Sequence, residues 1–301
     1  MALTLMEAEK YTTDTLRRGV IEVFARNSVI FELLPFMEIA GNAYAYNTEE
    51  ALPGIAFRGV NEGCVESAGV INQESEKLTI MGGDVDVDKF LAQTRGNIND
   101  IRGIQTEMKS KALALSWTRT FFKGDSTERA NEFDGLEKRV TGKQVLDAGG
   151  APISLELIDE LIDMVEGEPD VLLMSKAMRR KIKGLLQGST HYIESGEDSF
   201  GRPVNTYGGI PIRIVETDEE GKEILGFDEE GGTASIYAIK FGADQYVSGL
   251  RNGTVNVRDL GEIDAKPVFR TRIEFYSGMA IFHPRAVARL KGIGKGTPAG
   301  A

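Results

Sequence analysis

The sequence predicts an α+β fold in which a long helix packs against a sheet, an α/β block is inserted, and a hairpin projects from the body. Three observations predict this fold. Residues 97–123 have apolar side chains at helical spacing. In residues 42–88 apolar and polar side chains alternate as in strands, with interruptions at glycine-containing turns. Residues 141–250 alternate predicted strands with predicted helices, whereas the strands after residue 250 have helical partners only earlier in the chain.

The long helix is predicted from apolar residues at helical spacing, because the positions between them are mostly charged or polar. These residues are Ile98, Ile101, Ile104, Met108, Ala112 and Leu115, then Phe121 and Phe122. A helix over 97–123 would be roughly 40 Å long at 1.5 Å per residue. Gly124 follows as a C-terminal stop. We expect this helix to lie on a sheet formed by the last strands of the chain.

Two short helices are expected before the long one, at 13–26 and just after Ser28, followed by a two-stranded arm over 42–88. A two-stranded hairpin is marginally stable alone in water, and its edges expose unpaired backbone groups. The arm carries Ile55, Phe57, Val60 and Ile71. We therefore expect it to lie against a large partner, and a neighbouring subunit is the natural candidate.

The inserted block and the last third of the chain follow standard helix and strand patterns. Helices are expected at 153–165 and 176–188, and strands at 170–174, 204–206, 210–215 and 235–241. Three later strands are expected at 254–260, 268–275 and 277–283, after which Pro284 opens a short helix. A flexible tail is expected at 294–301.

Composition narrows the class of protein. The chain of 301 residues has a formal net charge of −11, with 46 acidic and 35 Lys or Arg residues, which disfavours tight binding to nucleic acid phosphates. An acidic protein can still enclose nucleic acid. Cys64 is the single cysteine, so no internal disulfide forms. The sequence has no apolar run of membrane-spanning length and no signal peptide, which predicts an intracellular product without a membrane contact.

No arrangement of residues predicts catalysis, a cofactor or a metal site. His191 and His283 lack an oriented Ser or Cys partner, and Cys64 has no local basic pair. An Asp84-x-Asp86-x-Asp88 run lacks the Gly and Glu that a calcium loop requires at its sixth and twelfth positions. The chain is thus expected to be a structural protein and not an enzyme. An enzyme with a dispersed active site in residues 141–250 is a competing interpretation.

The order of elements and three short segments resemble a known family. The segments are FFKGD at 121–125, FDGL at 133–136 and IEFYSGMAIFHPRAVARLKG at 273–292. In this order they resemble the major capsid proteins of tailed bacteriophages, which have the Hong Kong 97-like fold. The resemblance implies a structural subunit that self-assembles as pentamers and hexamers into the icosahedral head enclosing the phage genome. The alternative is the shell subunit of an encapsulin-like protein nanocompartment.

The resemblance also implies a division of the chain. It implies an N-terminal arm at 1–46, an extended E-loop at 47–88, a peripheral domain at 89–140 and 251–293 with the long helix as its spine, and an axial domain at 141–250. Candidate inter-subunit contacts are Phe24, Phe31, Ile55, Phe57, Arg58, Val60, Glu62, Glu66 and Ile71.

The resemblance has implications for partners and place as well. The N-terminal arm begins almost at Met1, so the resemblance favours a separate scaffolding protein. A portal and a decoration protein are further expected partners. The shell would enclose DNA without sequence-specific binding. The protein would occur in the virion, after assembly in the cytoplasm of the host bacterium.

Overall fold

A computed structural model describes residues 3–4, 23–24, 27–51, 53–95, 101–188, 194–197 and 203–296. The helices are α3 (Val29–Leu33), α4 (Lys89–Arg95), α5 (Ile101–Lys123), α6 (Leu136–Arg139), α7 (Leu155–Asp163) and α8 (Lys176–Gly188), with short 3-10 turns at Gly142–Gln144 and Glu230–Gly232. The strands are β1 (Leu3–Thr4), β2 (Pro35–Glu38), β3 (Ala43–Ala51), β4 (Val70–Lys77), β5 (Thr79–Asp88), β6 (Val145–Asp147), β7 (Val171–Met174), β8 (Glu194–Glu197), β9 (Pro203–Tyr207), β10 (Ile210–Ile214), β11 (Ala234–Ile239), β12 (Val247–Arg251), β13 (Asn256–Glu262), β14 (Val268–Ile281) and β15 (Val287–Ile293).

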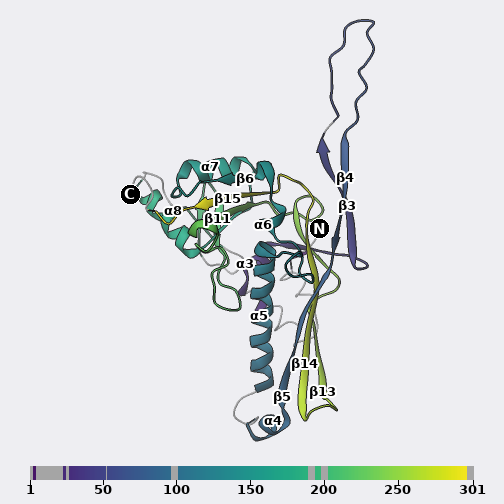
Figure 1. The fold of residues 1–301 in the computed structure, drawn as a ribbon, viewed down its shortest axis with the longest axis vertical. Coiled ribbons are helices and arrows are strands. Elements are labelled where there is room, and N and C mark those ends of the chain that lie inside the picture. The colour runs from purple at the N-terminus through teal and green to yellow at the C-terminus, as the bar shows by residue number, and fades with distance from the viewer. Residues whose placement is uncertain are drawn as a thin grey trace.

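A long helix and a long sheet form one end of the molecule. The sheet has the order β1-β2-β12-β14-β13, and β5 also pairs with β14 along its whole length. In Figure 1, α5 runs down the centre beside β5, β14 and β13, and α4 lies at the lower end. The predicted long helix is confirmed from Ile101 to Lys123, whereas residues 96–100 lie outside the described part of the chain.

The face that α5 buries differs from the predicted one. Its buried residues include Thr106, Ser110 and Thr118, while Ile104 and Met108 of the predicted apolar stripe are exposed. The buried hydroxyl groups are satisfied within the helix, since each donates to the carbonyl four residues earlier at 2.7–2.8 Å. The predicted apolar series is therefore wrong at Ile104 and Met108, whereas Phe121 and Phe122 at its end are buried. Small hydroxyl side chains allow the first half of the helix to lie close to the sheet.

A seven-stranded sheet with the order β6-β15-β11-β7-β10-β9-β8 forms the other half of the body. Helices α7 and α8 lie beside it (Figure 1), and both were predicted from the sequence. Ser154 and Ser175 cap them, because their hydroxyl groups accept hydrogen bonds from Leu157 N and Met178 N at 3.3 Å.

Strand β15 corrects two expectations. The segment after Pro284 forms a strand and not a short helix, and this strand belongs to the seven-stranded sheet although residues 251–293 were expected to stay with the long helix. It pairs with β11 on one side and β6 on the other. These two ladders and the complete burial of Ala288 and Leu290 outweigh the weak local preference for a helix.

One continuous core joins the two sheets. Trp117 of α5 is fully buried and donates from its indole N–H to Ser277 Oγ of β14 at 2.9 Å. Four residues further along the helix, Phe121 stacks on Trp117, and the ring of Phe122 contacts Tyr237 of β11 at 5.4 Å. The end of the spine helix therefore anchors both halves of the body.

Candidate subunit-contact site

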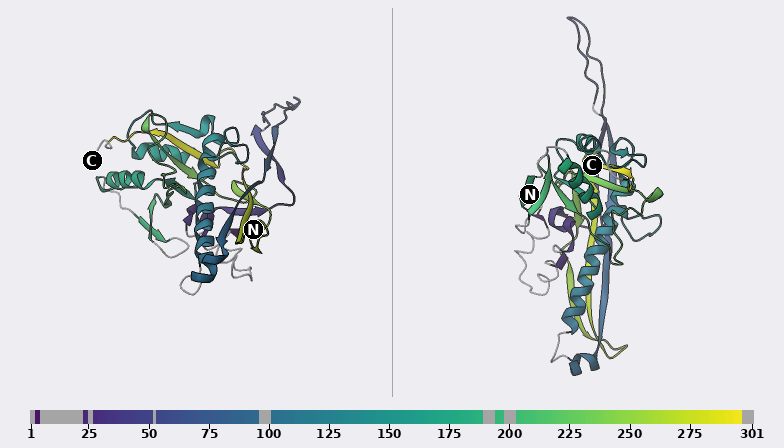
Figure 2. Two further views of the ribbon diagram at one scale, coloured as in Figure 1. Left: turned by 60° about the horizontal axis from the view of Figure 1, so that its bottom comes forward. Right: turned by 90° about the vertical axis from the view of Figure 1, so that its left-hand side faces the viewer.

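The most exposed element is a two-stranded arm formed by β3 and β4. Its ladder runs from Ala43 opposite Lys77 to Ala51 opposite Val70, with an irregularity between Glu49 and Ala51. Figures 1 and 2 show that the arm and the loop beyond it project away from the body, opposite to α4. The arm is shorter than predicted on its return side, because residues 79–88 form β5 and pair with β14 in the body.

The loop between β3 and β4 contains a few local hydrogen bonds. Ser67 Oγ donates to Gly54 O at 2.9 Å across the loop. At the tip, the Glu62 carboxylate accepts from Gly59 N at 2.7 Å, and Arg58 Nη1 donates to Glu62 O at 3.1 Å. Two of the predicted charged contact residues, Arg58 and Glu62, therefore shape the tip itself, while Glu66 is exposed.

Apolar side chains on this loop face solvent. The exposed fractions are 94% for Ile55, 105% for Phe57 and 92% for Val60, and Ile71 on β4 is 65% exposed. The structure thus groups these four predicted contact residues on one projecting element. Val65 belongs to the same group, since it is 75% exposed, and it was missed although it stands on the predicted arm. A monomer rarely exposes so many large apolar side chains together.

Two predicted contact residues lie elsewhere. Phe24 and Phe31 are buried in the core, with exposed fractions of 1% and 0%. Their rings meet edge to face at 5.2 Å, and Phe31 also lies 4.6 Å from the ring of Trp117. The helix expected at 13–26 lies mostly outside the described residues. Both aromatic side chains are already buried within their own chain, so the prediction that they contact a neighbour was wrong.

The base of the arm is fixed to the body by aromatic and charged groups. The ring of Tyr46 contacts Phe282 at 4.8 Å, and its hydroxyl donates to Glu74 Oε2 at 3.2 Å. Burial, with the negative charges of Glu76 and Glu74, raises the pKa of Tyr46 above its usual range. Arg139 of α6 donates to both carboxylate oxygens of Glu76, one of them at 2.6 Å. The ladder is thus held rigidly where it leaves the body.

Two of the segments that carried the family resemblance meet at the end of α5. Gly135 N donates to Gly124 O at 2.8 Å, so FFKGD and FDGL lie against each other. Lys138 contacts Asp125 at 2.6 Å and Asp134 at 2.9 Å. The hydrogen bond from Lys138, together with those from Thr127, lowers the pKa of Asp125 well below its ordinary value. We call residues 121–139 the corner.

Replacing Gly135 by Ala is expected to destabilise the chain by about 1–3 kcal/mol, the range for overpacking. A Cβ atom at this position would stand 2.6 Å from Gly124 N and 2.6 Å from Thr120 O, which are backbone atoms that cannot move aside. Urea denaturation of the unassembled chain measures the effect. The matched control is Gly184→Ala in α8, where nothing lies within 4 Å, so this change should leave stability unchanged or raise it by up to about 1 kcal/mol. Equal midpoints for the two variants would contradict the prediction.

The residues weighed for catalysis or metal binding have ordinary structural contacts. Arg272 and Arg270 donate pairs of hydrogen bonds to the carboxylates of Asp84 and Asp86 across the β5–β14 ladder. His283 pairs with Glu166 at 3.1 Å. Cys64 is exposed on the arm loop, and His191 lies outside the described residues. Within the described ranges, no group of three or more His, Cys, Asp or Glu residues is placed to hold a metal ion.

No helix in the described part of the chain is long and apolar enough to cross a membrane.

The chain matches a family model in part of its sequence and solved structures in its fold. Residues 13–156, a little under half of the chain, match the family model of the major capsid protein GP7. This match includes the arm, α5 and the corner. Over these residues the chain is similar to the major capsid proteins, and its fold is the Hong Kong 97-like fold of solved phage capsids. No curated protein sequence matches it.

Solved structures share the fold of this chain at low sequence identity. The holo-SrpI encapsulin of Synechococcus elongatus PCC 7942 superposes with a TM-score of 0.69 at 18% identity, over 99% of both chains. The capsid of a native GTA particle gives 0.66 at 13% identity over 89% of this chain and 90% of that one. Mycobacterium phage Bobi gives 0.65 at 10% identity over 89% and 91%. At such identities the likeness concerns the fold alone.

Proposed function

We propose that copies of this chain assemble as pentamers and hexamers into a closed icosahedral shell that encloses a phage genome. The observation that carries this proposal is the projecting arm, whose apolar side chains find no cover within the described part of their own chain. In a closed assembly each copy offers an arm to one neighbour and receives an arm from another, so every arm is covered. Repetition of the contact around the shell then adds avidity.

Within this proposal, Ile55, Phe57, Val60 and Ile71 bury their side chains on a neighbouring copy. Burial of an exposed aliphatic or aromatic side chain contributes about 1.5–3 kcal/mol, whereas an exposed ion pair contributes about 0–1 kcal/mol. The apolar residues therefore supply most of the contact energy, and Glu66 sets the register with Arg58 and Glu62. Within the proposal, residues 141–250 lie at the centre of each pentamer or hexamer, together with β15 of the same sheet.

The proposed shell has further partners. A separate scaffolding protein would guide assembly in the host cytoplasm, a portal would occupy one vertex, and a decoration protein would bind outside. The net charge of −11 suits a wall that encloses DNA without holding it tightly. The proposed role is structural and not enzymatic, which the match to a major capsid protein model supports.

A second candidate is the shell of a protein nanocompartment, which is favoured by the superposition on an encapsulin over 99% of both chains. Electron microscopy of the recombinant protein, with light scattering on the same sample, tests both candidates. Closed shells of uniform size, or rings of five and six, support the shell. DNA inside particles from the native host supports a capsid, and an enzyme cargo supports a compartment. A chain that stays monomeric or dimeric even with a co-expressed scaffolding protein overturns both.

A further inference from the structure

The four-residue helix α6 touches three parts of the molecule at once. It consists of Leu136, Glu137, Lys138 and Arg139, and its three charged side chains point to different partners. Leu136 is completely buried in the common core and fixes the helix from below. The helix stands between the end of the spine helix and β6, the edge strand of the seven-stranded sheet.

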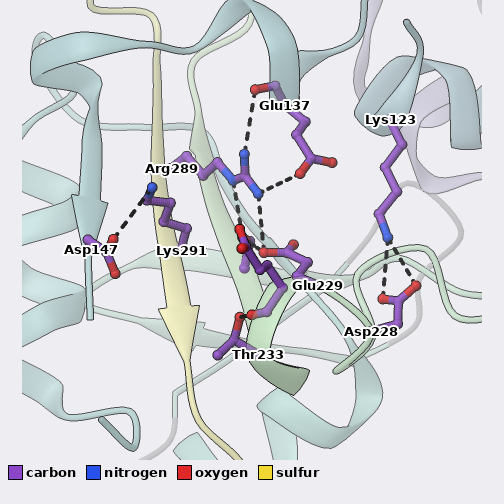
Figure 3. A network of polar contacts seen from close by, with 10 residues as sticks. Lys123, Glu137, Asp147, Asp228, Glu229, Thr233, Arg289 and Lys291 are labelled. Carbon is purple, nitrogen blue, oxygen red and sulfur yellow. Dashed lines mark hydrogen bonds and ion pairs between the residues drawn. The ribbon is translucent and has the colours of Figure 1, made fainter. Parts of the chain in front are cut away.

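Glu137 connects α6 to the seven-stranded sheet. Its carboxylate accepts from Arg289 Nη2 of β15 at 2.9 Å, and Figure 3 shows the guanidinium between Glu137 and Glu229. Arg289 also donates to Ser235 Oγ of β11 at 3.1 Å and contacts Glu229 at 3.2 Å. The Arg289 side chain is only 9% exposed. Losing an acceptor would thus leave this buried cation partly uncompensated.

Arg139 connects α6 to the arm. Its guanidinium holds the Glu76 carboxylate of β4 through two hydrogen bonds, and both side chains are 15% exposed. A two-pronged pair of this kind fixes direction as well as distance. Arg139 Nε donates to Asp134 O at 2.6 Å, so the arginine is itself oriented by the corner. The arm therefore meets the body through a side chain that cannot turn independently of α6.

Lys138 connects α6 to the end of the spine helix. Its ammonium group lies 2.6 Å from Asp125 Oδ1 and 2.9 Å from Asp134 Oδ1. Asp125 follows the end of α5 and Asp134 belongs to the FDGL segment, so Lys138 ties together two segments within the corner. Backbone hydrogen bonds from Lys138 N and Arg139 N to Gly135 O, at 3.2 and 3.1 Å, hold the three charged residues on one turn, so a tilt of α6 displaces the three charged groups together.

We propose that α6 is a joint that couples the position of the arm to the packing of the seven-stranded sheet. A displaced arm pulls on Arg139, which tilts α6 and shifts Glu137 against Arg289. Separating Arg139 from Glu76 would strand two charges that are each only 15% exposed. Separating Arg289 from Glu137 would leave the 9% exposed guanidinium with Glu229 as its carboxylate partner. A joint movement that keeps both pairs is therefore favoured over a separate one. Coupling of this kind is reciprocal, and a disturbance of β15 must also reach the arm. Its use during assembly rests on the proposed arm contact, but the coupling itself does not.

Amide hydrogen exchange of the purified full-length chain tests the joint from both ends. Glu137→Gln should raise exchange of the arm-base amides in residues 43–47 and 73–77 at least about fivefold, the low end for coupled sites. In the opposite direction, Glu76→Gln should raise exchange in β6 and β15 by a similar factor. The double variant should show less than the product of the two effects.

Lys123→Gln is the matched control, because the ion pair that Lys123 forms with Asp228 at 3.3 Å involves no residue of α6 (Figure 3). It should leave exchange in the arm unchanged. Unchanged exchange in α7 shows that each variant is folded, and Glu137→Asp, which shortens the side chain but keeps its charge, repeats the comparison. If each variant changes exchange only around its own pair, or if Lys123→Gln loosens the arm as much as Glu137→Gln does, the joint is refuted.

Discussion

Phe31→Ala should lower the free energy of unfolding of the unassembled chain by about 3–5 kcal/mol, the usual cost of removing a buried phenylalanine ring. Phe31 is completely buried, stacks at 5.9 Å on Phe36 and lies 4.6 Å from Trp117. These two neighbours belong to separate elements, β2 and α5, so they cannot close together over the cavity. Since native domains are stable by only about 5–15 kcal/mol, much of the variant would be unfolded. Urea denaturation followed by tryptophan fluorescence measures the loss.

Phe57→Ala provides the comparison for Phe31. Its side chain is fully exposed, so its removal should change the unfolding free energy by less than about 0.5 kcal/mol. The two variants therefore separate a core phenylalanine from a contact phenylalanine. A Phe31→Ala chain as stable as the wild type but unable to assemble would restore Phe31 as a contact residue.

The double change Ile55→Ser and Phe57→Ser should abolish shell formation while leaving the single chain folded. Both side chains are exposed on the arm loop, so no packing within the described part of their own chain depends on them. Each loses about 1.5–3 kcal/mol of burial at every contact, and each 1.4 kcal/mol is a factor of about ten in association. Light scattering and electron microscopy at conditions that assemble the wild type would show subunits or small rings.

Phe57→Leu is the matched control for the arm, because it keeps an apolar side chain and should retain shells. Urea denaturation of the double serine variant must also match the wild type, which separates loss of contact from loss of fold. Shells that form normally from the double serine variant would mean that the arm does not hold the assembly together.

The contacts of the three charged residues of α6 could not be predicted from the sequence. Glu137, Lys138 and Arg139 read as one short polar stretch after the FDGL turn. Their partners Arg289, Asp125 and Glu76 stand 152, 13 and 63 residues away along the chain. Pattern and spacing cannot pair residues at such separations, because only the folded backbone brings them together.

For the spine helix, the sequence predicts the helix but not the face that packs against the sheet. The periodicity of Ile104 and Met108 predicts a helix correctly, and that helix is present. It does not predict which face meets the sheet, where Thr106 and Ser110 lie instead. An apolar stripe measures the preference of side chains for burial, whereas the actual contact also depends on how closely the two backbones approach.

The sequence by itself determined the helices with strong periodicity and caps, such as α5, α7 and α8, and the presence of a projecting apolar arm. These features depend on neighbours within a few residues, which any stretch of sequence contains. Only the tertiary structure decided that β5 and β15 join sheets other than expected and that Phe24 and Phe31 lie in the core. Strand partners and burial depend on residues far away in the chain, because ladder hydrogen bonds and core contacts form only once those residues meet.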